Sequence, residues 1–238
     1  MNQLNQSNYD KFPTIKIDGY TCTEGWENIT GKVLEACNKY QNEKVVIAIE
    51  CYPGVYTHEI REQLQLHIPN AILLDASAAM QQNDEIEKMV YPFVTDDPVF
   101  GYMAPLNLTD FFDLGKVASM QKKLNAAKEG ICIVYGIGAS LIWPKPNLLL
   151  YADMPRWEIQ LRFRNKSIGN VGAQNQNVEF SYLYKRSFFV DWRVCDRHKK
   201  TLMNDWDYVL DTTIPNNPKL ISGAAFKYAM TETVSQPF

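Results

Sequence analysis

The sequence predicts a three-layer α/β fold whose central sheet is mainly parallel. Apolar stretches of strand length, such as residues 45–49 and 147–153, alternate with segments of helix length. These stretches are continuous rather than alternating, as expected of strands that helices cover on both faces. The 238 residues are 46% hydrophobic and 12% aromatic, which is enough for the core of one sizeable domain.

The first elements are expected in the order helix, strand, helix, strand. Residues 25–40 carry apolar side chains at the spacing of one helix face. The apolar run 45–49 follows as a buried strand. Residues 57–67 form the next helix, which a proline at position 69 ends. Residues 71–77 form the second strand.

The middle of the chain repeats this alternation. Residues 81–89 are polar and predict a helix, and residues 90–105 predict a loop. A longer helix is expected over 110–128, and Gly130 suits the position just after its end. Residues 131–140 then form the third strong strand.

The last elements are less regular. After the fourth strand, 147–153, a basic helix is expected over residues 155–165, with proline in its first turn. Residues 165–181 are polar and rich in Gly and Asn, which predicts a mobile loop. Residues 187–194 are interpreted as a strand, and 196–206 as a short helix.

Three parts are expected along the chain. Residues 1–44 form an N-terminal extension with a helix, and residues 45–214 form the main domain. Residues 215–238 carry three prolines and are interpreted as a C-terminal tail or a linker toward a further domain.

The composition excludes several function classes. The formal net charge of −3 gives no attraction to nucleic acid or to an anionic membrane. The three histidines match no zinc spacing, so no metal site is expected. Five cysteines without a C-x-x-C pair fit a reducing compartment. The N-terminus lacks a signal peptide's apolar stretch and no long apolar run occurs, so we expect a cytoplasmic protein.

The segment 44–60 has the layout of a phosphate-binding loop but not its residues. A P-loop, G-x-x-x-x-G-K-[ST], uses glycines to expose backbone amides and a lysine to neutralise phosphates. Its glycines are replaced here by Glu50 and Val55, and its lysine by a tyrosine. Thr57 keeps the final hydroxyl and Gly54 keeps a bend, so both remain candidates for binding phosphate. Glu50 would place negative charge beside a phosphate. This pattern argues against an ordinary ATP-dependent kinase.

Candidate site residues follow the predicted strands. Ligands of such sheets bind beyond the carboxyl ends of the strands, so residues 50–57, Asp75, 136–140 and 153–156 should surround one crevice. Asp75 is either a catalytic base or the N-cap of the next helix, and both interpretations stay open.

Basic residues form the second group of candidates. Arg156, Arg162, Arg164, Lys185 and Arg186 are predicted to bind phosphate, because a guanidinium grips it with two hydrogen bonds. The last two would act from a lid. The alternative is a solvated face paired with nearby carboxylates.

A cysteine nucleophile is a rival hypothesis. Cys51 lies at the turn from strand to helix, and His58 follows it by seven residues. We favour a buried, unreactive thiol at this position.

In their order along the chain, several segments resemble the uridine kinase and phosphoribulokinase branch of P-loop kinases. A-I-L-L-D-A-S has Asp75 at the position of that family's catalytic base. F-V-T-D-D-P-V-F-G (93–101) resembles its acidic segment. The strand 131–140 matches its Gly-Ile pair but has Tyr135 in place of a glutamate. Residues 148–165 resemble the strand that leads into its arginine-rich helix. The resemblance implies a degenerate P-loop kinase-like domain over residues 45–214.

The chain also resembles the N-terminal region of bacterial proteins that end in a class I mannose-6-phosphate isomerase. The motifs are E-C-Y-P-G-V (50–55), Y-G-I-G-A-S (135–140), Y-A-D-M-x-R-W-E-I-Q (151–160) and F-V-D-W-R-V-C-D-R-H-K (189–199). This resemblance implies a setting in hexose-phosphate metabolism. Any isomerase activity would then lie in a C-terminal partner domain beyond residue 238.

The function we expect is binding or regulation without catalysis by this chain alone, with a phosphosugar or a nucleotide as the ligand. One alternative is an atypical ATP-dependent sugar or nucleoside kinase, with Asp75 as base and Thr57 on Mg²⁺. Another is a structural, oligomerising domain. No cofactor is assigned, and Mg-ATP is disfavoured. The expected partners are a small phosphorylated ligand and the isomerase domain, and neither nucleic acid nor a membrane.

Overall fold

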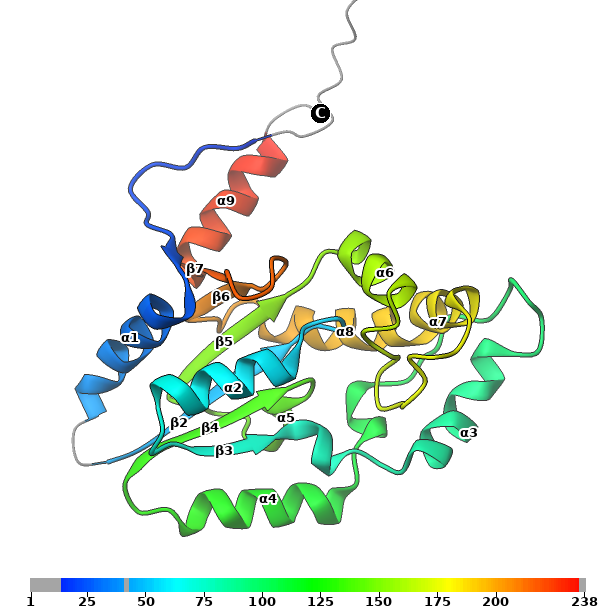
Figure 1. Cartoon of the computed structure of the whole chain (residues 1–238), viewed down its shortest axis with the longest axis horizontal. Coiled ribbons are helices and arrows are strands. Elements are labelled where there is room, and N and C mark those ends of the chain that lie inside the picture. Colours follow the sequence, from blue (N-terminus) through cyan, green and yellow to red (C-terminus); the bar gives the residue numbers. More distant parts are fainter. Residues whose placement is uncertain (1–13, 41–42, 236–238) are drawn as a thin grey trace, which may run out of the picture.

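The computed structural model describes residues 14–40 and 43–235. They form one seven-stranded sheet with helices on both faces (Figure 1). The strands are β1 (Thr23–Glu24), β2 (Lys44–Cys51), β3 (Ile72–Asp75), β4 (Gly130–Gly136), β5 (Leu148–Asp153), β6 (Tyr208–Asp211) and β7 (Lys219–Ser222). The α-helices are α1 (Trp26–Cys37), α2 (Thr57–His67), α3 (Asn83–Val94), α4 (Leu114–Ala126), α5 (Ala139–Ile142), α6 (Arg156–Arg164), α7 (Phe180–Arg186), α8 (Trp192–Leu202) and α9 (Gly223–Ser235). Shorter helical turns are η1 (Asn38–Tyr40), η2 (Ala76–Ala79), η3 (Leu108–Phe111) and the π-helical η4 (Ser187–Asp191).

The sheet is mainly parallel, which confirms the predicted class. The strand order is β1-β7-β6-β5-β2-β4-β3, and the five strands from β6 to β3 are parallel. At the centre of β2, Ile47 is paired with Ile133 of β4 and Leu148 of β5. Only β7 and β1 add an antiparallel edge. All five parallel strands therefore present their carboxyl ends at the same side of the molecule.

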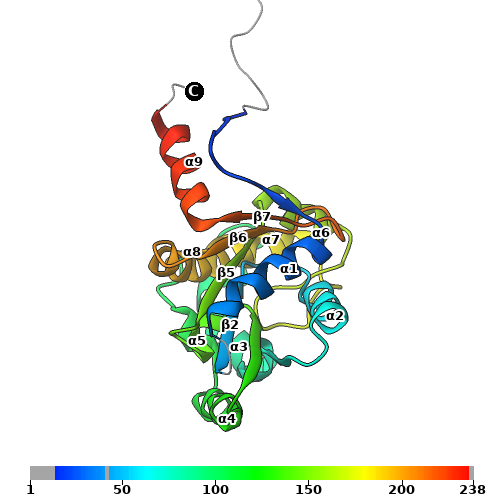
Figure 2. The same ribbon diagram turned by 90° about the vertical axis from the view of Figure 1, so that its left-hand side faces the viewer.

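Three layers explain the apolar runs. Figure 2 shows α1 and α2 on one face of the sheet and α5 and α8 on the other. Both faces of β2 are thus covered, and Val46, Ile47 and Ala48 are all buried. A strand in this position gains stability from an apolar side chain at every residue, not at every second one.

The interpretation of residues 187–194 as a strand is wrong. They form η4 and the start of α8, in a helical stretch that begins with α7. The segment is rich in aromatic and β-branched residues, which favour strands in general. Its buried residues Val190 and Val194 are four apart and lie on one helix face, so packing against the core overrides local propensity.

The chain ends contain more regular structure than expected. The segment interpreted as a tail or linker forms β7 and α9, and β1 pairs with β7 in the register Thr23 to Leu220.

Helix α3 is also longer than expected. It continues to Val94, inside the segment 90–105 that was expected to be a loop, despite Pro92 within it. No helix in residues 14–40 and 43–235 has the length and apolarity needed to cross a bilayer.

The turn after β4 provides a test of the packing. Gly138 and Gly130 both have a φ of +84°, a backbone angle that residues other than glycine rarely adopt. A Cβ at Gly138 would lie 2.2 Å from Cζ of the buried Phe112 ring, whereas one at Gly130 meets nothing within 4 Å. Gly130→Ala is expected to lower the free energy of unfolding by about 1 kcal/mol, through backbone strain alone.

Gly138→Ala is expected to cost about 2 kcal/mol more than Gly130→Ala, because the ring must move within a packed core. Urea denaturation of both variants measures the difference. Equal losses would show that the Phe112 contact is absent.

Candidate functional site

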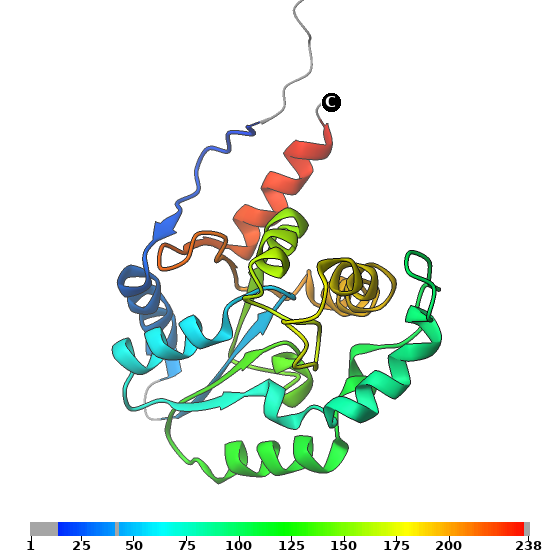
Figure 3. The same ribbon diagram turned by 45° about the vertical axis from the view of Figure 1, so that its right-hand side comes forward.

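A cavity of about 720 Å³ lies beyond the carboxyl ends of β2, β3 and β4. Its walls include residues 53–58 after β2, Asp75 at the end of β3 and Gly136 at the end of β4, together with residues 167–174. Figure 3 shows the segment between α6 and α7 running beside the ends of these strands. The structure thus brings Gly54, Thr57 and Asp75 together, as expected, whereas residues 153–156 line a different hollow.

The loop after β2 is packed closely against α6. Gly54 has a φ of +98°, and a Cβ there would lie 2.7 Å from Cγ1 of Ile159 in α6. Val55 is buried, and its amide donates a hydrogen bond of 3.3 Å to the carbonyl of Tyr52. Gly54 therefore serves a close approach to α6 as well as the bend.

Tyr56 stands where a P-loop has its lysine, and it joins two walls of the cavity. Its hydroxyl donates a 2.8 Å hydrogen bond to Oγ of Ser167. The guanidinium carbon of Arg162 lies 3.9 Å from the centre of its ring, in the geometry of a cation–π contact. A phosphate-binding lysine is replaced here by an anchor between the loop and the 165–179 segment.

Glu50 does not face the cavity, contrary to the expectation that it would repel a phosphate. Its buried carboxylate accepts hydrogen bonds from the amides of Gly138 (2.7 Å) and Ser140 (2.8 Å), and from the Ser140 hydroxyl (2.7 Å). Nε2 of His198 lies 3.5 Å from the same carboxylate and 2.8 Å from the Ser140 Oγ. The glutamate binds a turn of its own chain.

Asp75 has the capping role that was one of its two interpretations. Its Oδ1 accepts a 2.9 Å hydrogen bond from the Ser77 amide and so caps η2. It also lies on the cavity wall, against Gly136, where a Cβ would stand 3.3 Å from that oxygen. The two roles are compatible, because a carboxylate has several lone pairs and the cap uses one.

Three of the basic residues predicted to bind phosphate hold backbone carbonyls instead. Arg162 is buried and donates to the Gly54 carbonyl at 2.8 Å. Arg186 is fully buried and donates to the Val171 carbonyl at 2.8 Å. Lys185 donates to the carbonyls of Thr95 and Asp97. Arg162 and Arg186 thereby fix the backbone of two cavity walls, since residues 54 and 171 both line it.

The other two predicted residues lie outside the cavity as well. Arg164 packs its guanidinium 4.0 Å from the centre of the Phe180 ring. Arg156 forms a 2.5 Å ion pair with Asp196 of α8 and lines the other hollow. The five basic residues therefore do not converge on the loop after β2.

Lys116 is the cavity residue that sequence reasoning missed. It lies in the first turn of α4, and its Nζ donates a 2.7 Å hydrogen bond to the carbonyl of Met80 on the cavity wall. No local pattern separates it from the other lysines of that helix. The amide side chains on the same walls are those of Gln81, Gln82, Asn83, Asn170 and Gln174.

The cavity has no visible site for a resident metal. Among the described residues, no group of three or more His, Cys, Asp or Glu side chains is arranged to hold a metal ion. The polar groups of the cavity include the Lys116 ammonium, the Asp75 carboxylate, side-chain amides, the His58 imidazole and several hydroxyls, which belong to Tyr56, Thr57, Ser77 and Ser167. Such a set suits a small polar molecule.

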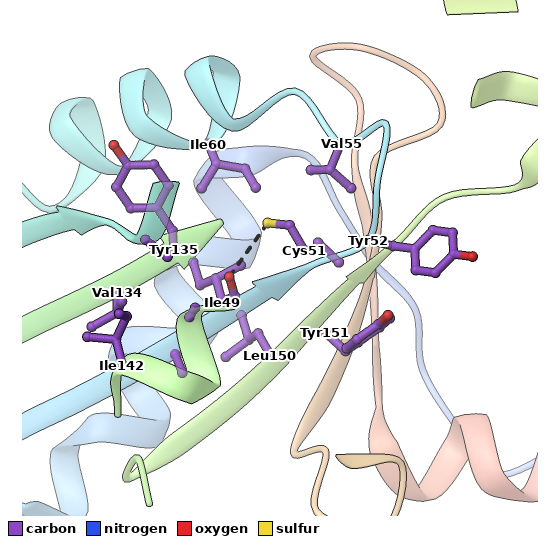
Figure 4. Packing of buried hydrophobic residues seen from close by; sticks show 14 of the residues in the cluster. Ile49, Cys51, Tyr52, Val55, Ile60, Val134, Tyr135, Ile142, Leu150 and Tyr151 are labelled. Atoms are coloured by element: carbon purple, nitrogen blue, oxygen red, sulfur yellow. Dashed lines mark hydrogen bonds between the residues drawn. The ribbon is translucent and has the colours of Figure 1, made fainter. Parts of the chain in front are cut away.

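Cys51 is turned into the core. Figure 4 shows its sulfur between Ile49 and Ile60, and its thiol donates to the Ile49 carbonyl at 3.5 Å. Burial, and then the charge of Glu50, raise the pKa of the Cys51 thiol far above its ordinary value. His58 is exposed on α2. These observations support the interpretation of Cys51 as a buried thiol rather than a nucleophile.

A family model described as "Domain of unknown function (DUF8485)" matches residues 25–235. No curated protein matches the chain. Among solved structures, a protein named as a fructose transport system kinase, from Silicibacter sp. TM1040, is similar with a TM-score of 0.48 and 13% identity. The match covers 74% of this chain and 94% of that chain. At this level of likeness, no inference about the present chain rests on it.

Thiol reactivity tests the placement of Cys51. Alkylation of the folded protein by iodoacetamide at pH 8 is expected to modify Cys22, which is exposed, and to leave Cys51 unmodified. Only the thiolate reacts, and the raised pKa keeps Cys51 protonated at this pH. Peptide mass spectrometry reads the result, with the urea-unfolded protein as the control. Labelling of Cys51 at the rate of Cys22 would contradict its burial.

Proposed function

The chain belongs to the DUF8485 family, and from its own cavity we propose that it binds a small phosphorylated molecule without ordinary ATP-dependent phosphoryl transfer. The observation that carries the proposal is the cavity beyond β2, β3 and β4, which has binding groups but no triphosphate cradle. Binding without transfer is the chemistry of a regulatory or sensing domain.

One end of the cavity suits a single phosphate group. Helix α2 begins at Thr57, and its N-terminus opens on the cavity, where the helix dipole favours an anion. The Lys116 ammonium lies on a wall of the same cavity and supplies a positive charge. A helix N-terminus and one ammonium can balance one phosphate monoester, but not the charge of a nucleoside triphosphate.

The loop after β2 argues against nucleotide chemistry. Phosphoryl transfer depends on amides and a lysine that surround the β- and γ-phosphates. Here Val55 is buried and Tyr56 is bound to Ser167, so neither residue is placed to replace those groups. This packing leaves fewer exposed backbone N–H groups than a phosphate-binding loop supplies.

The other end of the cavity suits hydroxyl groups. Side-chain amides both donate and accept hydrogen bonds, as hydroxyls do, and four of them belong to Gln81, Gln82, Asn83 and Gln174. Asp75 adds an acceptor. A ligand that combines one phosphate with several hydroxyls, as a sugar phosphate does, matches both ends.

The hexose-phosphate setting and an isomerase partner domain are part of the proposal, and they rest on the sequence motifs. Residues from these motifs contact one another. Tyr52 donates a 2.7 Å hydrogen bond to Asp196, which also pairs with Arg156. Glu50 binds Ser140 and lies near His198. The four motifs thus form one packed unit, which supports treating them as a single signature. A cytoplasmic location is also proposed, because the five cysteines include no C-x-x-C pair and fit a reducing compartment.

An atypical kinase is the second candidate. Asp75 and Thr57, the residues that would act as base and magnesium ligand, both line the cavity. In this case the cavity would have to accept a nucleotide together with a sugar or nucleoside.

Thermal-shift and calorimetric titrations test the proposal. Fructose 6-phosphate or mannose 6-phosphate is expected to raise Tm, whereas Mg-ATP is not. At a hundredfold excess over Kd, the bound ligand adds about 2.7 kcal/mol to the free energy of unfolding. Lys116→Met should weaken hexose-phosphate binding by about tenfold or more, because one charged hydrogen bond is lost. Lys123→Met, an exposed lysine of the same helix, is the matched control.

The outcomes separate the candidates. If Mg-ATP binds with micromolar affinity and its γ-phosphate is transferred to a sugar, the chain is an atypical kinase. If neither ligand class binds, or if Lys116→Met binds as tightly as the Lys123→Met control, the proposed site is wrong.

A further inference from the structure

A second cavity, of about 580 Å³, lies beyond the carboxyl ends of β5 and β6. Residues 53–56 face the first cavity, whereas Tyr52 lines this one, so the loop after β2 contributes to both. Figure 4 shows the Tyr52 side chain pointing toward the β5 side, away from Cys51 and Val55. Neither the proposed function nor the sequence motifs assign this cavity a ligand.

One wall of the second cavity consists of paired charges. Arg156 and Asp196 form an ion pair of 2.5 Å, and Lys199 and Asp153 form another of 2.5 Å. The Tyr52 hydroxyl donates to the second oxygen of Asp196 at 2.7 Å. The ion pairs hold these charges in place. The side chains of the first pair are still 45% and 40% exposed, so a ligand can reach them.

The lining as a whole is electrically neutral. It contains three cations and three carboxylates, and the two charges outside the ion pairs are those of Lys219 and Asp211. Lys219 pairs with Glu24 at 3.4 Å, and Asp211 accepts a hydrogen bond from the Thr213 amide at 2.8 Å. A charged ligand would have to break a pair or leave a like charge beside it, which costs free energy.

The floor of the cavity is apolar. Met154, which follows β5, and Val209 of β6 contribute buried apolar side chains to it, and Phe226 of α9 closes one side. The Phe226 ring is held by the Trp206 ring, with 5.4 Å between their centres. The cavity thus combines a polar wall with an apolar floor.

We propose that this second cavity binds a neutral, polyhydroxylated molecule, such as an unphosphorylated sugar or polyol. A hydroxyl donates to a carboxylate and accepts from an ammonium or guanidinium, so it can bridge Asp153 and Lys199, or Asp196 and Arg156, without disturbing their charge balance. Each carboxylate keeps lone pairs beyond those used in its pair. The C–H face of a sugar ring packs on the apolar floor and on Phe226.

Tyr52 fixes the geometry of this wall. Burial, and then its hydrogen bond to Asp196, raise the pKa of the Tyr52 hydroxyl well above its ordinary value, so it stays a donor across the physiological range. Asp196 is thereby held between two donors, Tyr52 and Arg156. Its position does not depend on the ligand, which lowers the entropic cost of binding.

A methionine in each cavity makes the two sites separately observable. Met154 lines the second cavity and Met80 lines the first. The protein is labelled with ¹³C-methyl methionine and titrated with D-mannose, D-fructose or D-mannitol at millimolar concentrations. The NMR signal of the Met154 methyl group is expected to shift until it saturates, and the Met80 signal is expected not to shift. Mannose 6-phosphate, the probe for the proposed function, is expected to shift Met80 and not Met154.

Variants test the wall directly. Asp153→Asn should weaken the binding of the neutral sugar by tenfold or more, and Asp205→Asn, an exposed aspartate outside the lining, should not change it. If Asp153→Asn fails to fold, Phe226→Leu keeps an apolar side chain but removes the ring, and it should weaken binding several-fold. The proposal is overturned if no neutral sugar gives a saturating Met154 shift, or if Asp153→Asn or Phe226→Leu binds as tightly as the wild type.

Discussion

The buried carboxylate of Glu50 is the interaction on which the site architecture depends. An ionised carboxylate without partners in a core costs many kcal/mol, so its position requires the donors that surround it. The amides of Gly138 and Ser140 and the Ser140 hydroxyl provide them, at 2.7 to 2.8 Å. The end of β2 is thereby tied to the turn after β4, and through His198 to α8. The turn after β4 adjoins the first cavity through Ile137, and α8 lines the second through Asp196 and Lys199, so the Glu50 carboxylate connects a wall of each cavity.

The loop between the cavities is anchored by side-chain contacts on both sides. A lysine in a phosphate loop must be free to reach its ligand, whereas the two tyrosines here are bound. Tyr52 holds Asp196 on one side, and Tyr56 holds Ser167 on the other. Arg162 adds a hydrogen bond to the Gly54 carbonyl between them. The loop is thus held at three points, and its residues separate the first cavity from the second.

Sequence reasoning predicted the fold well because burial on both faces leaves a continuous apolar pattern. Strands β2 to β5 follow from such local signals. The sequence left the capping role of Asp75 as one of two interpretations, and the single crevice it predicted is divided in the structure into two hollows. It was wrong for residues 187–194, where strand-like composition lies on a buried helix. For the basic residues, the alternative of pairing with nearby carboxylates agrees with the ion pairs of Arg156 with Asp196 and of Arg162 with Glu158. The backbone carbonyls that Arg162 and Arg186 also bind were not foreseen. Whether a guanidinium binds a carbonyl or a phosphate depends on which acceptor the tertiary structure brings near it. The position of Lys116 in the cavity likewise depends on the tertiary structure and not on a local sequence pattern.

Amide hydrogen exchange at Gly138 and Ser140 tests the role of Glu50 most directly. Glu50→Gln keeps the shape of the side chain but replaces one acceptor oxygen by a donor, so at least one of the surrounding donors loses its partner. The account predicts that both amides exchange slowly in the wild type and markedly faster in Glu50→Gln, while the amides at the centre of β2 stay protected. Unchanged exchange at Gly138 and Ser140 in the variant would contradict it, because the turn would then be held by something other than the carboxylate.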